Sequence, residues 1–234
     1  MANSLAECKL LVVEDNRVNA EVVKHHLSHA GYQHIHMVAN GKEALRAMSS
    51  QKPDAVILDM VMPEMDGFEF SQALRSNQHW ANMPVMVQTG IEDQSEKIRV
   101  FEAGASDFVN KPVDGKELVA RIKVHLMNKI LLEEVSERKE QMQHELMAAQ
   151  KMQKNVMPSA SVVQNIQAQY NMQIAGHIEP SSIMGGDCWG LTPLDKHRLA
   201  LYSYDFSGHG VTAALNVFRL QTLMQDVHDT AQSP

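Results

Sequence analysis

Cysteine is scarce in this chain, which has only two among its 234 residues, Cys8 and Cys188. Two thiols so far apart in sequence provide neither a disulfide framework nor the ligand set of a zinc ribbon. The sequence therefore favours two idle or buried thiols in a reducing compartment.

Long apolar runs are also missing. No stretch approaches the ~20 residues that a membrane-spanning helix needs. The first nine residues, Met1–Lys9, are too short and too polar for a signal peptide. These two absences predict a cytoplasmic protein with no membrane partner.

Positive charge is limited as well. The chain carries 21 Lys and Arg residues against 28 Asp and Glu residues, which gives a net charge of -7. No run of Lys and Arg occurs, and no helix-turn-helix pattern with a basic second helix is visible. A nucleic-acid partner is therefore not expected.

Short apolar runs alternate with helical patterns through the first half of the chain. The runs are Lys9–Val13, His34–Val38, Ala55–Leu58, Pro84–Gln88 and Asp107–Val109, and helical spacing separates them, as in Val18–Ala30 and Lys42–Met48. Continuous apolar strands joined by helices are typical of a parallel sheet covered on both faces. The sequence predicts an α/β, flavodoxin-like, doubly wound domain with five parallel strands.

Chemically active side chains follow several of these strands. They are Glu14 and Asp15 after the first run, Asp59 after the third, Thr89 after the fourth and Lys111 after the fifth. The carboxyl ends of parallel strands lie along one edge of a sheet, so these residues should meet in one crevice. Carboxylates suit Mg²⁺, a fixed cation suits phosphoryl oxygens, and a hydroxyl can pull its loop inward when phosphate is present.

Residues 7–128 resemble the receiver domains of two-component response regulators. The likeness rests on Val-Glu-Asp (13–15), Leu-Asp-Met-Val-Met-Pro (58–63), Asp-Gly (66–67), Thr-Gly (89–90) and Lys-Pro (111–112). The resemblance implies that a sensor histidine kinase or a phosphotransfer protein phosphorylates Asp59. It also implies that Glu14, Asp15, Asp59 and the carbonyl of Val61 hold Mg²⁺.

The same resemblance assigns a phosphoryl contact to Lys111, a switch pair to Thr89 and Phe108, and a cis bond to Lys111-Pro112. For Phe108, ordinary core packing is an equal alternative. Asp66 is expected to cap a helix that begins near Gly67. The histidines at 25, 26, 29, 34 and 36 show no shared ligand spacing and are interpreted as ordinary surface residues.

Residues 129–157 contain no glycine and no proline. A heptad fits Leu132, Val135, Lys139, Met142, Leu146, Ala149, Gln153 and Val156, of which Lys139 and Gln153 are polar. This pattern favours a helix that continues from the receiver and pairs as a parallel coiled-coil homodimer. The alternative is a single amphipathic helix lying on its own domain.

Residues 158–234 change character again. Ile166–Ile178 and Arg198–Tyr204 are predicted to be strands, 185–186 and 208–210 turns, and Val211–Val227 a helix. Two aspartates, Asp187 and Asp205, stand beside glycines at predicted strand ends, where they could approach a metal pair closely. The pattern predicts the beginning of an α+β domain.

From about residue 145, the chain resembles the bacterial PPM-type, metal-dependent serine/threonine phosphatases that regulate sigma factors. The likeness rests on Ala-Gln-Lys-Met-Gln (149–153), Met-Pro (157–158), Glu-Pro-Ser (179–181), Gly-Gly-Asp (185–187) and Ser-Gly-His-Gly-Val-Thr-Ala-Ala (207–214). It implies a Mn²⁺ or Mg²⁺ pair held by Asp187, Asp205 and the Phe206 carbonyl, with a structural role for His209.

Two departures from this family affect the functional prediction. Gly190 stands where many members have a second acidic residue, and the chain stops at Pro234 before the later aspartates that complete the metal site. We therefore expect a truncated domain that is inactive by itself.

One hypothesis is that Asp59 controls a phosphatase of the full-length parent, acting on a phosphoserine protein such as an anti-sigma-factor antagonist. The alternative is a non-catalytic docking module that binds a sigma factor or its regulator.

Overall fold

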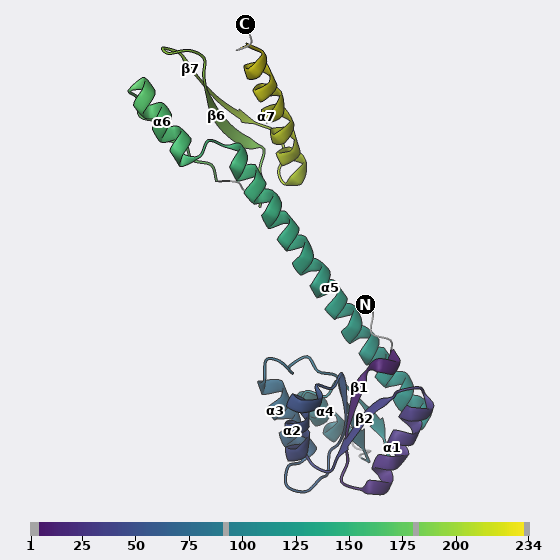
Figure 1. Ribbon diagram of the computed structural model, residues 1–234. Coiled ribbons are helices and arrows are strands. Elements are labelled where there is room, and N and C mark those ends of the chain that lie inside the picture. Colours follow the sequence, from purple (N-terminus) through teal and green to yellow (C-terminus); the bar gives the residue numbers. More distant parts are fainter. Residues whose placement is uncertain (1–4, 91–93, 180–182, 232–234) are drawn as a thin grey trace. The chain divides into compact units, whose positions relative to one another are not determined.

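A computed structural model describes residues 5–90, 94–179 and 183–231 (Figure 1). The chain divides into two compact units, Met1–Val135 and Ser136–Pro234. Each unit is described by itself.

The first unit is built on a five-stranded parallel sheet with the strand order β2-β1-β3-β4-β5. Its strands are β1 Lys9–Val13, β2 His34–Val38, β3 Ala55–Asp59, β4 Val85–Thr89 and β5 Asp107–Asn110. The expected doubly wound, flavodoxin-like fold is thereby confirmed.

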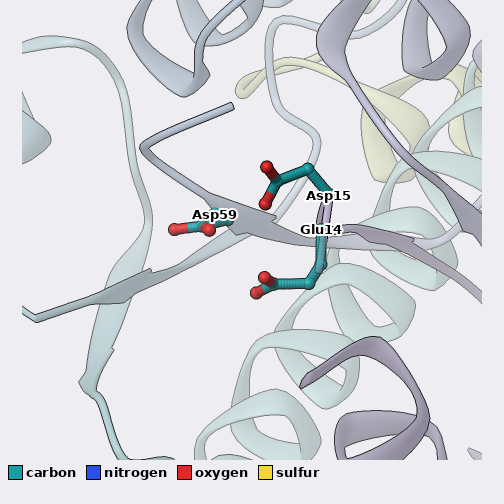
Figure 2. Close-up of side chains that lie close together, drawn as sticks. All are labelled: Glu14, Asp15 and Asp59. Atoms are coloured by element: carbon teal, nitrogen blue, oxygen red, sulfur yellow. The ribbon is translucent and has the colours of Figure 1, made fainter. Parts of the chain in front are cut away.

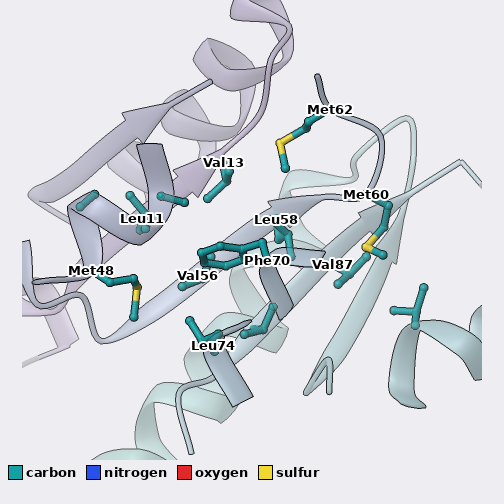
Figure 3. Packing of buried hydrophobic residues seen from close by; sticks show 14 residues of the cluster. Leu11, Val13, Met48, Val56, Leu58, Met60, Met62, Phe70, Leu74 and Val87 are labelled. Atoms are coloured by element: carbon teal, nitrogen blue, oxygen red, sulfur yellow. The ribbon is translucent and has the colours of Figure 1, made fainter. Parts of the chain in front are cut away.

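Helices cover both faces of this sheet, and each face has its own apolar cluster. The helices are α1 Arg17–His29, α2 Gly41–Gln51, α3 Gly67–Ser76, α4 Gln94–Glu102 and α5 Gly115–Val156, preceded by a 3₁₀ turn at Leu5–Glu7. One cluster surrounds Phe70 and Leu74 of α3 (Figure 3). The other joins Leu27 of α1 to Leu118 and Ile122 of α5. The central strands β3 and β4 are buried along their whole length, and most of their residues are apolar.

Local signals set the helix boundaries. Asp66 accepts a hydrogen bond from the Glu69 amide at 2.8 Å, and the Glu69 carboxylate accepts one from the Asp66 amide at 3.1 Å. This capping box confirms that Asp66 caps α3, which begins at Gly67. Gly31, with a φ of +98°, follows the C-cap Ala30 of α1, and glycine adopts this left-handed conformation readily at the end of a helix.

Helix α5 is one continuous helix of 42 residues. Arg121 pairs with Asp107 of β5 at 3.0 Å, and Lys129 pairs with Asp54 before β3, so ion pairs attach its first part to the sheet. The predicted continuation of the receiver's last helix is confirmed. Of the helices within the described residues, none combines the length and apolarity needed to cross a membrane.

The second unit contains a two-stranded antiparallel sheet and helices. Its elements are α6 Ala160–Tyr170, β6 Asp187–Pro193, β7 Leu199–Asp205 and α7 Val211–Ala231. Helix α7 packs on one face of the sheet, where Gln221 bonds to the hydroxyls of Tyr202 and Tyr204. The predicted β7 strand and α7 helix are confirmed.

The predicted strand at Ile166–Ile178 is wrong. Its first part belongs to α6, and the residues from Met172 to Glu179 form no regular element. The Ser159 hydroxyl caps α6 by accepting a hydrogen bond from the Val162 amide, and this cap favours a helix.

The final turns of α5 pack within the second unit. Gln153 is 7% exposed, and its amide group bonds to both the carbonyl and the amide of Gly185. This position of the predicted heptad is therefore buried inside its own chain, as in the alternative of a helix lying on its own domain.

Candidate functional site

Three carboxylates gather at the carboxyl ends of β1 and β3. The carboxyl groups of Glu14, Asp15 and Asp59 lie within 4.8 Å of one another and face a common space (Figure 2). Strand β1 is paired in register with β3, so the residues that follow Val13 stand beside Asp59. The expected convergence of these three residues is observed.

Glu14 is almost completely buried, with 3% of its surface exposed. One carboxylate oxygen accepts hydrogen bonds from the Asn19 side chain at 3.2 Å and the Asn16 amide at 3.4 Å. Sequence reasoning did not identify these asparagines, although Asn16 directly follows the acidic pair and caps α1. They hold the Glu14 carboxylate at the edge of the sheet.

Lys111 provides the positive charge of the site. Its ammonium lies 2.9 Å from Glu14 Oε2 and 2.8 Å from Asp59 Oδ2. Burial by itself lowers the pKa of Lys111, but the hydrogen bonds and charges of Asp59 and Glu14 outweigh it, so the net pKa is raised. The ammonium is therefore a permanent cation beside two carboxylates at neutral pH.

Thr89 and Phe108 lie on neighbouring strands. Thr89 is buried at the end of β4, and Phe108 on β5 stands opposite Val87 in the register. The Phe108 ring packs against the α3-side cluster and, edge to face, against Phe101 at 5.7 Å. The two expected switch residues are thus close in the sheet, and the packing alternative for Phe108 is also satisfied.

The loop after β3 completes the edge of the site. The Val61 amide lies 3.5 Å from Asp59 Oδ1, and the Val61 side chain is 78% exposed. Gly67 lies so close to β3 that a Cβ there would be 2.5 Å from the Asp59 carbonyl oxygen. A side chain at position 67 would therefore push on the strand end that carries Asp59.

The donor set fits a hard divalent cation. It consists of carboxylate oxygens from three residues, one exposed and two buried. Mg²⁺ prefers such oxygen ligands and retains several waters, which the exposed Asp15 side allows. Among the residues that the structure describes, this is the only group of three or more such side chains near enough to share a metal. The histidines at 25, 26, 29, 34 and 36 belong to no group of this kind among the described residues.

The second unit brings its two predicted ligands together. Asp187 and Asp205 are direct partners across β6 and β7, and both are exposed. The Phe206 carbonyl oxygen packs so closely on Gly186 that a Cβ there would lie 2.3 Å from it. Glycine is therefore required next to the aspartate pair. Pro180 and Ser181 of the predicted motif lie outside the described residues.

Gly190 lies on the other face of the small sheet. A Cβ at this position would lie 2.3 Å from the Tyr202 ring, on the side that α7 covers. Side chains alternate along a strand, so position 190 points away from the face of Asp187. An acidic residue here would not join the Asp187–Asp205 pair in this fold.

The comparisons with known proteins agree on the first half of the chain. Residues 10–123 match the family described as "Response regulator receiver domain". The response regulator MprA of Mycolicibacterium vanbaalenii is 38% identical over 118 residues, which are 50% of each chain, and that of Mycobacterium bovis is 37% identical. The chain thus spans about half the length of the curated relatives it matches.

Solved structures show the same likeness. A chain from Chloroflexus aurantiacus described as a response regulator is 36% identical, with a TM-score of 0.50, over 52% of this chain and 98% of that one. A signal receiver domain from Vibrio parahaemolyticus, described for a Luxo repressor protein, is 26% identical with a TM-score of 0.51, over 55% and 97%.

Residues 10–123 are therefore a response regulator receiver domain with a two-component signalling function. Receiver domains bind Mg²⁺ at an acidic pocket of the kind formed by Glu14, Asp15 and Asp59, and they typically take their phosphate from a histidine kinase.

Proposed function

We propose that this chain is a response regulator that accepts a phosphoryl group on Asp59 and passes the signal along α5 to an output in the second unit. The observation that carries the proposal is the ion pair of Lys111 with both Asp59 and Glu14 beside a third carboxylate, Asp15. A nucleophile, a cation and a set of metal ligands are what acyl-phosphate formation needs.

The transfer step follows from this arrangement. An Asp59 carboxylate oxygen attacks the phosphorus of a phosphohistidine, the phosphorus–nitrogen bond breaks, and the imidazole recovers a proton from solvent. Glu14, Asp15, Asp59 and the Val61 carbonyl would hold Mg²⁺, which offsets the charge of the phosphoryl oxygens. Lys111 turns from the carboxylates to a phosphoryl oxygen and stabilises the same charge.

Thr89 and Phe108 would report the phosphoryl group to the rest of the molecule. The Thr89 hydroxyl donates to a phosphoryl oxygen and draws its loop inward, and Phe108 moves with the neighbouring strand. Strand β5 is tied to α5 through the Asp107–Arg121 ion pair. A change at β5 therefore has a direct connection to the helix that leads into the second unit.

For the output we propose a PPM-type serine/threonine phosphatase, complete in the full-length parent and acting on a phosphoserine protein of the anti-sigma-factor-antagonist type. The paired Asp187 and Asp205 and the closely approaching Phe206 carbonyl support it as ligands of a Mn²⁺ or Mg²⁺ pair. A contact of α5 supports regulation of this phosphatase by the receiver. The Gln153 side chain of α5 donates a hydrogen bond to the carbonyl of Gly185, two residues before Asp187, so a movement of α5 could reach the metal ligands.

A non-catalytic docking module for a sigma factor or its regulator is the alternative. It is favoured by the small donor set of the second unit. Among the described residues, Asp187 and Asp205 have no third carboxylate, histidine or cysteine close enough to complete a metal group.

We also propose a homodimer through residues 129–157. Leu132, Val135 and Met142 of the heptad are all at least 63% exposed, so they are available to a second copy. The side chain of Gln153 already bonds to Gly185 of its own chain. The proposed dimer contact is therefore limited to the heptad positions before Gln153.

The receiver assignment is tested by incubating the chain with acetyl phosphate and Mg²⁺ and measuring its mass. We expect one phosphoryl group on the wild type and none on Asp59→Asn. Asp66→Asn is the matched control, because asparagine caps a helix as well as aspartate does. Unchanged phosphorylation of Asp59→Asn would contradict the assignment.

The output is tested on the complete gene product by Mn²⁺- or Mg²⁺-dependent phosphate release from a phosphoserine protein, with and without acetyl phosphate. Turnover that disappears in Asp205→Ala supports the phosphatase. Folded protein without turnover in any of these conditions supports docking instead.

A further inference from the structure

Three histidines that the receiver chemistry does not use lie together on α1. The centre of the His25 ring is 5.9 Å from that of His26 and 6.2 Å from that of His29. None of the three imidazoles has a hydrogen bond or an ion pair with another described residue. Their ring nitrogens are therefore available to a ligand from solution.

His25 and His29 have the spacing of a metal-binding pair on a helix. They are four residues apart in α1, so both side chains project from the same side of the helix. Zn²⁺ binds histidine nitrogen at ~2.0–2.1 Å, so two imidazoles on one tetrahedral ion have their ring centres about 5 Å apart. The observed 6.2 Å exceeds this separation by about 1 Å. Both side chains are exposed, so they are free to rotate and close the difference.

The surroundings of this pair add a carboxylate. Asp114, in the loop before α5, lines the same surface pocket as the histidines. Its Oδ1 accepts hydrogen bonds from the amides of Lys116 at 2.7 Å and Glu117 at 3.2 Å, while Oδ2 has none from a described residue. Lys116 lines the pocket as well, but its side chain is exposed and can turn to solvent. The pocket therefore offers imidazole nitrogens and one carboxylate oxygen to a cation.

The neighbouring histidines are less suited to this role. The His26 ring packs on Gly115, where a Cβ would lie 2.2 Å from Nδ1, so the ring is not free to turn toward His29. His34 and His36 project from the same face of β2, but within the described residues their rings make no contact with each other. His29 is therefore the partner of His25 for which both spacing and freedom to rotate agree.

We propose that His25 and His29 bind a divalent transition-metal ion through their imidazole nitrogens, with Asp114 or water as further ligands. Imidazole suits Zn²⁺, Ni²⁺ and Cu²⁺, whereas carboxylate and carbonyl oxygens suit Mg²⁺. The receiver then has two sites that prefer different metals, the acidic one beside Asp59 and this one on α1. In this proposal the two histidines are more than the ordinary surface residues that the sequence suggested.

The test is a calorimetric titration of the full chain with Ni²⁺ in saturating Mg²⁺, which keeps the carboxylates near Asp59 occupied. We expect the wild type to bind one Ni²⁺ that depends on the α1 pair. His25→Gln and His29→Gln should each weaken this binding by at least about tenfold, because losing a ligand costs no less than losing a residue that only orients one. Glutamine is uncharged and favours a helix, so α1 should stay intact.

His36→Gln and Asp205→Ala are the matched controls, and both should bind this Ni²⁺ as the wild type does. The first removes a histidine of β2, and the second removes a carboxylate of the metal pair proposed for the second unit. The melting temperature of each variant without Ni²⁺ shows whether the protein is folded, and we expect no change in His25→Gln or His29→Gln.

Two outcomes would overturn the proposal. A wild type that binds no Ni²⁺ in saturating Mg²⁺ would show that the histidine pair is not a metal site. Binding that is weakened by less than about tenfold in either His25→Gln or His29→Gln would place the ion elsewhere. A loss in His36→Gln or Asp205→Ala would then locate it. Neither result bears on the receiver assignment, which the acetyl phosphate experiment tests separately.

Discussion

The two units of this chain differ in how completely their sheets are covered. In the receiver, helices bury both faces of five strands, and side chains such as Phe70, Leu58 and Ile57 are fully enclosed. In the second unit, α7 covers one face of a two-stranded sheet, while Leu201 on β7 is 61% exposed and Leu215 on α7 is 60% exposed. Two strands with one covered face are marginal by themselves.

This difference shows what each unit needs in order to be stable. The receiver is stabilised by apolar clusters formed from its own residues. Its polar side chains at the carboxyl ends of the strands can therefore serve the candidate site. The second unit relies on specific polar contacts, such as Gln153 with Gly185 and Gln221 with two tyrosines, to hold its elements together. We therefore expect that truncating an apolar side chain lowers the stability of the first unit most. In the second unit, we expect the loss of a hydrogen bond to lower stability most.

The largest effect should come from Phe70→Ala, which removes a fully buried ring from the receiver core. Such changes cost about 3–5 kcal/mol, whereas Val217→Ala in the second unit should cost about 1–2 kcal/mol. Urea unfolding can follow the units separately through Trp80 and Trp189, the only two tryptophans. If the two variants lost equal amounts of stability, the proposed difference between the two units would be contradicted.

A smaller effect is expected from Gln153→Met, which keeps the size of the side chain and removes both hydrogen bonds to Gly185. The unpaired backbone groups should destabilise the second unit by about 1–3 kcal/mol. The Trp189 signal should shift while the Trp80 signal stays in place. Gln150→Met on the same helix serves as control, and a similar shift there would show that packing rather than hydrogen bonding is responsible.

The smallest effect, and one that depends on pH, is expected from Asp107→Asn. Burial raises the pKa of Asp107, but the Phe108 amide, Arg121 and His125 outweigh it, and the net pKa is lowered. The stabilisation is therefore present above the unfolded pKa of ~3.9 and lost as pH falls through the folded value. We expect a loss of about 1 kcal/mol at pH 7 that is smaller at an acidic pH below ~3.9.

Glu117→Gln changes the exposed partner of the same arginine and should have almost no effect at either pH. A loss in Asp107→Asn that does not change with pH would mean that the ion pair with Arg121 is not its cause.

Much of the receiver could be predicted because its strands are continuous apolar runs. The bounds of β1 and β2 agree with the sequence-based expectation to the residue, and a parallel sheet places the residues after β1, β3 and β5 at one edge. Glu14, Asp15, Asp59 and Lys111 could therefore be grouped before their positions were known.

Other features depend on contacts that a periodic pattern does not encode. A strand was predicted at Ile166–Ile178, but Ser159 caps a helix that includes its first residues. Gln153 fitted a heptad but is buried against Gly185. In each case a side-chain orientation determines the outcome, and local sequence gives little information about it.

Gly67 makes the receiver sensitive to a single small substitution. Its missing Cβ leaves room for the Asp59 carbonyl, so the smallest possible side-chain gain, one methyl group, would press on the backbone of Asp59. A codon change to alanine would be scored as conservative by charge and size, and alanine even has the higher helix preference. We predict that such an allele nonetheless impairs the proposed phosphorylation of Asp59.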